Sequence, residues 1–374
     1  MLPRESELGI RAVRIWEARL RYREPFRTAL GTSHIARNLI VELETDFGPI
    51  GLGSCAPLPR VTGESFEMAL EALKAIGREL VGACPLRAEL IRELACKIAP
   101  NCPAARAAVD IALFDILGQV AKRPLYRLLG GYRDAIQTDI TIGLKGPAEM
   151  AQDALRAVEA GFRALKLKVG TSLEEDVERV RAVRDAVGPD VEIRVDANQA
   201  WSVQEAIRAA KALGKLDVAF IEQPTPAGGL EGLARVRHES PVPIMADEAV
   251  KGPADALRAV ELEAVDLINI KLMKCGGIWE AMKIAAIAEA AGVGLMVGCG
   301  GEGRVSITAG AHLAGALRAI TYADLDSDLL LAEDVAEGGS VVEGDLRLLP
   351  DEPGLGIKGL REGAMRLLAS FGTR

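Results

Sequence analysis

The sequence is poor in the residues that build most zinc, redox and disulfide sites. It contains three histidines, His34, His238 and His312, which leaves little material for a histidine-rich metal centre. Its six cysteines include no C-x-x-C pair, and the first 30 residues hold too many Arg and Glu residues for a secretory leader. We therefore expect reduced thiols in a cytoplasmic protein rather than a disulfide framework.

The chain also has no excess of positive charge and few long apolar runs. Acidic residues outnumber basic residues by 53 to 45, and the net charge of −8 argues against a nucleic-acid partner. The most apolar stretch, residues 281–301, is broken by Lys283 and Glu289 and is rich in glycine, which argues against a membrane span. What the chain has is length: 374 residues, 49% of them hydrophobic, are enough for one large or two moderate domains.

The hydrophobic pattern changes along the chain. Residues 1–60 alternate as in antiparallel strands and helical spacing follows from Ser65, so residues 1–130 are expected to form an α+β domain. Residues 131–344 repeat strand and helix, which favours an α/β fold with a closed βα barrel over a doubly wound sheet with fewer strands. Residues 345–374 are expected to return to the N-terminal domain. The predicted barrel strands lie near residues 137–142, 163–169, 191–196, 218–222, 242–247, 266–271, 293–298 and 319–324.

Five charged residues close apolar runs at nearly regular intervals. The intervals are 28, 26, 25 and 24 residues, and each is the length of one strand with its return helix. Because parallel strands carry their carboxyl ends to the same edge of a sheet, the five side chains are expected to form one site. They are Lys168, Asp196, Glu222, Asp247 and Lys271.

The three carboxylates predict a site for a hard divalent cation. Oxygen ligands without histidine or cysteine favour Mg²⁺, with Mn²⁺ as a substitute. The alternative interpretation is that each acidic residue caps the helix after its strand. Because the pattern recurs at Asp196, Glu222 and Asp247 in three successive units, we favour metal binding.

Three lysines suggest acid–base chemistry. Lys166 and Lys168 are two residues apart in an apolar strand, so both side chains point into the same interior. Each ammonium group disfavours the charged form of the other, which would lower a pKa that starts near about 10.4 and make proton abstraction feasible. Lys271, four strands further on, would face them across the barrel.

The motifs LKLKVG, RVDANQAW, FIEQP, IMADE and INIKLMKCGG together resemble the muconate-lactonizing subgroup of the enolase superfamily, from EPFRTALGT at 24–32 to PGLGIKG at 353–359. The resemblance implies a (β/α)₇β barrel under an α+β capping domain. It also implies Mg²⁺-dependent removal of a proton α to a carboxylate, through an enediolate. By this resemblance Asp196, Glu222 and Asp247 bind the metal, Lys168 and Lys271 are the two acid–base groups, and Lys166 tunes Lys168.

The last predicted strand narrows the reaction. It reads TYADLDSDLL, and the two-residue spacing predicts that Asp324 and Asp326 share one strand face. The pair resembles the D-x-D with which dipeptide epimerases bind the α-ammonium group of their substrate. The resemblance therefore implies an isomerase that epimerises the C-terminal residue of a dipeptide. A helix cap or an acidic turn is the alternative interpretation of the pair. A muconate-type cycloisomerase, an o-succinylbenzoate synthase or an N-acylamino acid racemase would use the same half-reaction, and a non-catalytic binding protein would share the scaffold.

Two N-terminal loops, EPFRTALGTSH and CAPLPRVTGES, are expected to cover the far end of the substrate. Relatives that act on Ala-Glu place a basic residue after T-A-L, whereas this chain has Gly31. Either Arg27, His34 or Arg60 replaces that basic residue, or the substrate has a different, more apolar side chain. The sequence therefore leaves the identity of the dipeptide open.

The segment Gly298–Gly303 matches G-x-G-x-x-G but follows the seventh barrel strand rather than opening a first βαβ unit. We interpret it as a flexible active-site loop in which Gly300 and Gly301 widen the pocket. Lys166, Gly300, Glu302 and Arg27 are expected to contact the substrate. Cys275 and Cys299 are expected to serve in packing. By analogy with relatives we expect a homo-oligomer.

Overall fold

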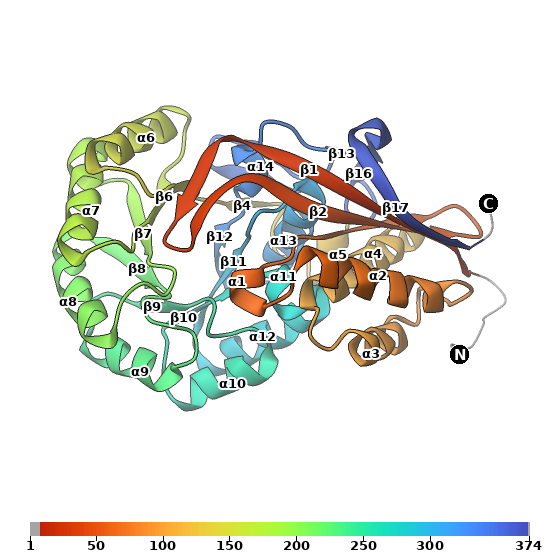
Figure 1. Cartoon of the computed structure of the whole chain (residues 1–374), viewed down its shortest axis with the longest axis horizontal. Coiled ribbons are helices and arrows are strands. Elements are labelled where there is room, and N and C mark those ends of the chain that lie inside the picture. Colours follow the sequence, from red (N-terminus) through yellow and green to blue (C-terminus); the bar gives the residue numbers. More distant parts are fainter. Residues whose placement is uncertain (1–7, 373–374) are drawn as a thin grey trace.

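The N-terminal part of the chain is an antiparallel sheet packed on helices (Figure 1). The computed structural model describes residues 8–372. The sheet has the order β17-β1-β2-β3, so the C-terminal strand pairs with the first one. Its strands are β1 (Ile10–Thr28), β2 (Gly31–Thr45), β3 (Ile50–Cys55) and β17 (Met365–Gly372), and the helices of this part are α1 (Pro59–Thr62), α2 (Phe66–Leu80), α3 (Ala88–Ile98), α4 (Pro103–Ala121) and α5 (Leu125–Leu129).

Local sequence explains how these helices pack. Helix α2 starts where the Ser65 side chain accepts a hydrogen bond from the Met68 N–H group (3.2 Å), and it buries one apolar face. Helix α4 is buried nearly all round and lies directly under β3. A Cβ atom at Gly53 would lie 1.8 Å from the carbonyl oxygen of Ala108, so only glycine permits this contact.

The second part is a barrel of eight parallel strands in sequential order, with seven long helices outside it. The predicted α/β class and the eight strand positions are confirmed. The strands are β5 (Ile140–Ile142), β6 (Ala164–Lys168), β7 (Glu192–Asp196), β8 (Val218–Glu222), β9 (Ile244–Ala246), β10 (Leu267–Ile270), β11 (Gly294–Gly298) and β12 (Ile320–Asp324). The helices are α6 (Pro147–Glu159), α7 (Leu173–Val187), α8 (Val203–Leu213), α9 (Leu230–Glu239), α10 (Pro253–Glu261), α12 (Ile278–Ala291) and α13 (Arg304–Ala316).

The seam between β5 and β12 is closed by individual contacts rather than by a ladder. The N–H group of Asp139 donates to the carbonyl oxygen of Ala323 (3.2 Å). The buried guanidinium of Arg194 donates to the Asp139 carboxylate (2.8 Å) and to the Ala323 carbonyl (3.0 Å). This ion pair neutralises both charges inside the barrel and holds the first and last strands together.

Short elements join the two parts. Strand β4 (Ala135–Gln137) pairs with β15 (Leu346–Leu348), and the hairpin of β1 and β2 reaches from the N-terminal sheet to the barrel (Figure 1). The boundaries that we predict at residues 130 and 345 stay a prediction. Among the described residues, no helix is both long and apolar enough to cross a bilayer. The remaining elements are α11 (Leu272–Cys275), α14 (Ser327–Leu330), β13 (Ala336–Gly338), β14 (Val341–Glu343), β16 (Ile357–Leu360) and the 3₁₀ helices Gly214–Leu216 and Glu362–Ala364.

Candidate active site

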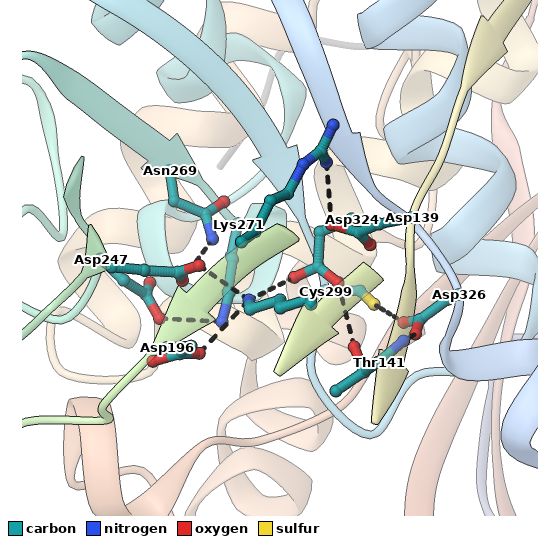
Figure 2. A network of polar contacts seen from close by, with 12 residues as sticks. Asp139, Thr141, Asp196, Asp247, Asn269, Lys271, Cys299, Asp324 and Asp326 are labelled. Carbon is teal, nitrogen blue, oxygen red and sulfur yellow. Dashed lines mark hydrogen bonds and ion pairs between the residues drawn. The ribbon is translucent and has the colours of Figure 1, made fainter. Parts of the chain in front are cut away.

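The carboxyl ends of the barrel strands bring together all five regularly spaced charged residues. Lys168, Asp196 and Glu222 are the last residues of β6, β7 and β8. Asp247 and Lys271 directly follow β9 and β10. All five are buried, and none is more than 8% exposed. Figure 2 shows Asp196, Asp247 and Lys271 pointing into the same space.

Lys166 is the centre of the ion pairs below this edge. Its Nζ atom lies 2.7 Å from Asp324, 2.8 Å from Glu222 and 3.3 Å from Asp196. Burial would lower the pKa of Lys166, but the three carboxylates outweigh burial and hold this pKa well above its usual range. The expected mutual lowering of the Lys166 and Lys168 pKa values is therefore wrong for Lys166, because opposite charges outnumber the like charge beside it.

The other two lysines each pair with one carboxylate. Lys168 Nζ lies 2.5 Å from Asp196 Oδ2, and Lys271 Nζ lies 2.8 Å from Asp247 Oδ2. Burial would raise the pKa of both aspartates, but the ammonium groups outweigh burial and lower it. Since β6 and β10 are four strands apart in a barrel of eight, the two lysines approach the centre from opposite sides.

Several buried oxygen atoms beside the carboxylates lack a hydrogen-bond donor. Glu222 accepts a bond from Asn269 at Oε1 (2.8 Å), whereas its Oε2 has no donor in hydrogen-bonding geometry, although Lys166 is near. Oδ1 of Asn198 and Oε2 of Glu248 also lack a donor. Buried oxygen atoms without a donor need another partner, and a hard cation with its water ligands fits them.

The ligand set on β7, β8 and β9 suits Mg²⁺ in chemistry, because it contains only oxygen donors. Lys166 contacts Asp196 and Glu222, and Lys271 contacts Asp247. Within residues 8–372 the closely spaced group of three potential ligands is a different one: Cys299 Sγ and oxygen atoms of Asp324 and Asp326 lie within 4.8 Å of one another. That group contains a thiol, which Mg²⁺ does not favour.

Asp324 and Asp326 are neighbours, but they do not share a strand as the D-x-D spacing predicts. Strand β12 ends at Asp324, and Asp326 precedes α14 without capping it through its side chain. Thr141 N–H donates to Asp326 Oδ2 (2.6 Å), and the Cys299 thiol lies 3.7 Å from Oδ1 (Figure 2). Burial and the Asp324 charge raise the pKa of Asp326 to about 6. In Asp324, Lys166 outweighs burial and lowers the pKa to about 2.

A cavity of about 460 Å³ lies between the barrel mouth and the N-terminal part. Lys168, Lys271, Asp324 and Asp326 line its barrel side, whereas Lys166, Asp196 and Glu222 are buried outside its wall. The opposite side is mainly apolar. It is lined by Phe26, Leu30, Ile35, Leu58, Val61 and Phe66, among others.

Three glycines at the cavity lie close to side chains of the N-terminal part. A Cβ atom at Gly31 would lie 2.5 Å from a guanidinium nitrogen of Arg60. At Gly300 it would lie 2.8 Å from Leu58, and at Gly301 it would lie 2.9 Å from the Tyr22 hydroxyl. Gly300 and Gly301 both line the cavity beside Leu58 and Tyr22, and the expectation that they widen it stays a prediction.

Three residues considered for substrate binding lie outside the cavity wall. Phe26 and Thr28 on β1 line the cavity, but Arg27 between them does not, and neither does the exposed His34. Glu302 is buried and accepts a hydrogen bond from the Gly300 N–H group (2.8 Å), so it shapes the loop.

The 298–303 loop is hydrogen-bonded to the N-terminal sheet. Asn38 on β2 donates to the carbonyl oxygen of Gly301 and accepts from the N–H group of Gly303, both at 2.9 Å. These bonds tie the loop to the N-terminal sheet, and its expected flexibility stays a prediction. Cys275 is buried against backbone carbonyls, in agreement with a packing role.

Sequence reasoning missed three polar residues of this site. Thr141 holds Asp326, and Asn269 holds Glu222. Lys274 is 1% exposed and bonds Asp247. Only Lys274 had a signal in the sequence, since it stands one helical turn after Lys271 in K-L-M-K.

Comparison with known proteins identifies the family. Residues 10–130 match the mandelate racemase/muconate lactonizing enzyme N-terminal domain, and residues 149–362 match the enolase C-terminal domain-like model. The chain belongs to the mandelate racemase/muconate lactonizing enzyme family of the enolase superfamily. The predicted superfamily is confirmed.

Several members of this family are close relatives. A hydrophobic dipeptide epimerase of Enterococcus faecalis is 45% identical over 94% of this chain and 99% of that protein. An L-Ala-D/L-Glu epimerase of Clostridium acetobutylicum is 44% identical over 90% of this chain and 95% of that protein. The crystal structure of the E. faecalis dipeptide epimerase with Mg and L-Leu-L-Tyr superposes with a TM-score of 0.92, at 44% identity, over 94% of this chain and all of that one.

Proposed function

We propose that this protein is a Mg²⁺-dependent dipeptide epimerase, an isomerase that inverts the α-carbon of the C-terminal residue. The observation that carries the proposal is the arrangement of the cavity wall. Two lysines approach the cavity from opposite sides of the barrel, and a pair of aspartates lies in the same wall. Dipeptide epimerases are among the most similar relatives.

Asp196, Glu222 and Asp247 are the proposed metal ligands. A Mg²⁺ ion bound there supplies positive charge that stabilises the electron density built up on the substrate carboxylate when the α-proton leaves. The oxygen-only donor set and the oxygen atoms without a donor on Glu222 and Glu248 support this assignment. Mn²⁺ is the proposed substitute ion.

Lys168 and Lys271 are the proposed acid–base pair. A base on one face of the α-carbon removes the proton, and an ammonium group on the other face delivers one, which inverts the centre. Both Nζ atoms must leave their present carboxylate partners to do so, and binding of a cation at those carboxylates would release them. Lys166 is the proposed fixed cation that keeps the neighbouring carboxylates ionised.

Asp324 and Asp326 are the proposed partners of the substrate's α-ammonium group. Two buried carboxylates next to each other need a cation, and Lys166 supplies only one contact, to Asp324. A free amine from the substrate completes the pair. This requirement separates a dipeptide from a muconate, which brings only negative charge.

The side chain of the C-terminal residue is proposed to be apolar or aromatic. The far side of the cavity is lined by Phe26, Leu30, Leu58 and Phe66, and burial of apolar substrate atoms there is favourable. The relative with 45% identity is a hydrophobic dipeptide epimerase, which supports the same class. We further propose that the protein is cytoplasmic and forms a homo-oligomer.

A dipeptide library in D₂O with Mg²⁺ tests the function. Mass spectrometry should find one deuterium in particular dipeptides, and chiral analysis should find both epimers of their C-terminal residue. The matched N-acetyl dipeptides lack the ammonium group and should react far more slowly. No deuterium in any dipeptide would refute the proposal, and preferred turnover of the N-acetyl compounds would favour an N-acylamino acid racemase instead.

A further inference from the structure

Asp247, a proposed metal ligand, directly follows strand β9 and is held in place by hydrogen bonds from other segments. Strand β9 ends at Ala246, so the sheet does not fix the residue that follows. The N–H group of Asp247 donates to Gln223 Oε1 (2.9 Å), which anchors its backbone on one side. Its carbonyl oxygen accepts from the N–H group of Val250 (3.1 Å), so the carboxylate is the group that depends on side-chain partners.

Lys274 contacts both the carboxylate and the carbonyl group of Asp247. Its Nζ atom donates to Asp247 Oδ1 (2.8 Å), to the Asn269 carbonyl oxygen (2.9 Å) and to the carbonyl oxygen of Asp247 itself. These contacts use all three hydrogen atoms of the ammonium group. Lys274 is 1% exposed and does not line the cavity, so it has neither a free donor nor a path to the substrate.

Lys271 contacts the other oxygen of the same carboxylate, but in a different setting. It bonds Asp247 Oδ2 (2.8 Å) and lines the cavity. Asp247 therefore carries one cation that is fixed in the protein interior and one that faces the cavity. When Lys271 leaves Oδ2, Lys274 still neutralises and orients the carboxylate.

We propose that Lys274 is a positioning residue of the metal site, which fixes Asp247 by its carboxylate and its backbone and directs Oδ2 toward the cation. The inference rests on the proposed metal role of Asp247. Partners of metal ligands commonly change metal affinity by about 10- to 100-fold when they are removed. The opposing expectation is simple repulsion, by which a fixed positive charge weakens cation binding and its removal strengthens it.

Titration of the full-length protein with Mg²⁺ alone, by calorimetry and without substrate, separates these expectations. Lys274→Met should raise the Mg²⁺ dissociation constant at least about tenfold. Lys283→Met is the matched control, because Lys283 is a half-exposed lysine on α12 that pairs with Glu280. The control should bind Mg²⁺ as the wild type does.

Unchanged or tighter Mg²⁺ binding by a folded Lys274→Met protein would overturn the inference and leave the proposed function intact. Absence of Mg²⁺ binding by the wild type would instead overturn the proposed metal site and this inference with it. If Lys274→Met fails to fold, Lys274→Gln takes its place, since its amide group can still donate hydrogen bonds but carries no charge. The same rise in the dissociation constant is expected there.

Discussion

The Nζ atom of Lys166 lies 2.7 Å from Oδ2 of Asp324, which joins the acid–base side of the site to the side proposed to bind the substrate amine. The strand that carries Lys168 thus also supplies the cation that keeps Asp324 ionised, with a pKa of about 2. Lys166 reaches Asp196 and Glu222 as well. One buried charge therefore supports three carboxylates with two proposed roles.

Replacing Lys166 with Met should impair both halves of the site. Without the ammonium group, burial dominates at Asp324 and raises its pKa, so a cationic substrate loses a charged partner. We expect kcat/KM to fall at least about 30-fold, the cost of truncating one partner of a buried charge pair. Steady-state kinetics at pH 7 measure it, with Lys211→Met as the control because Lys211 is an exposed lysine paired with Glu239. A Lys166→Met enzyme as active as this control would contradict the shared role.

Loss of one proposed base should stop exchange from one epimer only. Lys168→Ala and Lys271→Ala should each reduce epimerisation by about 10²- to 10⁴-fold, the usual contribution of an acid–base group. Each variant is incubated in D₂O with each pure epimer, and NMR follows the α-proton. One variant should still exchange the α-proton of one epimer, and the other variant should exchange only that of the opposite epimer. The same variant exchanging both epimers would disprove the two-sided arrangement.

The barrel and the cluster at its edge were predictable because both depend on local patterns. Apolar runs of four to six residues with helical segments between them specify parallel strands, and parallel strands bring their ends together. Lys168, Asp196 and Glu222 are indeed the last residues of three successive strands. The spacing alone therefore predicts that these three side chains lie together at the carboxyl edge of the barrel.

The partners of these residues were not predictable from spacing. Lys166 and Asp324 are 158 positions apart, and their contact depends on closure of the barrel. Arg60 fills the space over Gly31 only because α1 packs beside β2. Asp326 leaves the strand face that its spacing indicated, since β12 ends two residues earlier. Such contacts follow from packing between distant segments rather than from local periodicity.

The binding of a cationic dipeptide should weaken below pH 6. Asp326 has a raised pKa of about 6 in the free protein, so it is ionised above that pH and gains a proton below it, whereas Asp324 stays ionised. We expect log kcat/KM to fall with a slope of one as the pH drops through 6. Asp326→Asn should lower kcat/KM by orders of magnitude at pH 8 and should remove this limb from the profile. Retention of the limb in the variant would assign it to another group.

Arg60 should set the charge preference for the side chain of the C-terminal residue. Its guanidinium lines the apolar end of the cavity over Gly31, and no acidic side chain in residues 8–372 forms an ion pair with it. We expect Arg60→Glu to raise the ratio of kcat/KM for L-Ala-L-Lys over L-Ala-L-Glu at least about tenfold, since like charges repel and opposite charges attract. Arg27→Glu makes the same change of charge outside the cavity wall and is the control. An equal change of the ratio in both variants would mean that the overall charge of the protein, and not the position of Arg60, sets the preference.

His312 should make the fold less stable in acid. The ring is fully buried: Nδ1 accepts from the Tyr126 N–H group (3.1 Å), and Nε2 lies 3.3 Å from the Leu355 carbonyl oxygen. Burial lowers the pKa of His312 from 6.5 to about 4. Between pH 6.5 and about 4, His312 is therefore protonated in the unfolded chain but neutral in the folded protein. The free energy of unfolding that is present above pH 6.5 is lost as the pH falls toward 4.

The loss attributable to His312 is on the order of 3 kcal/mol across that window, at 1.36 kcal/mol for each pKa unit. Urea unfolding of the wild type and of His312→Gln at several pH values measures it. Glutamine keeps a donor and an acceptor but does not titrate, so the variant should lose less stability on acidification. It should be less stable than the wild type at pH 7, because it replaces a fully buried ring. Parallel pH profiles for the two proteins would mean that His312 has the same pKa in the folded and the unfolded state, and would contradict the prediction.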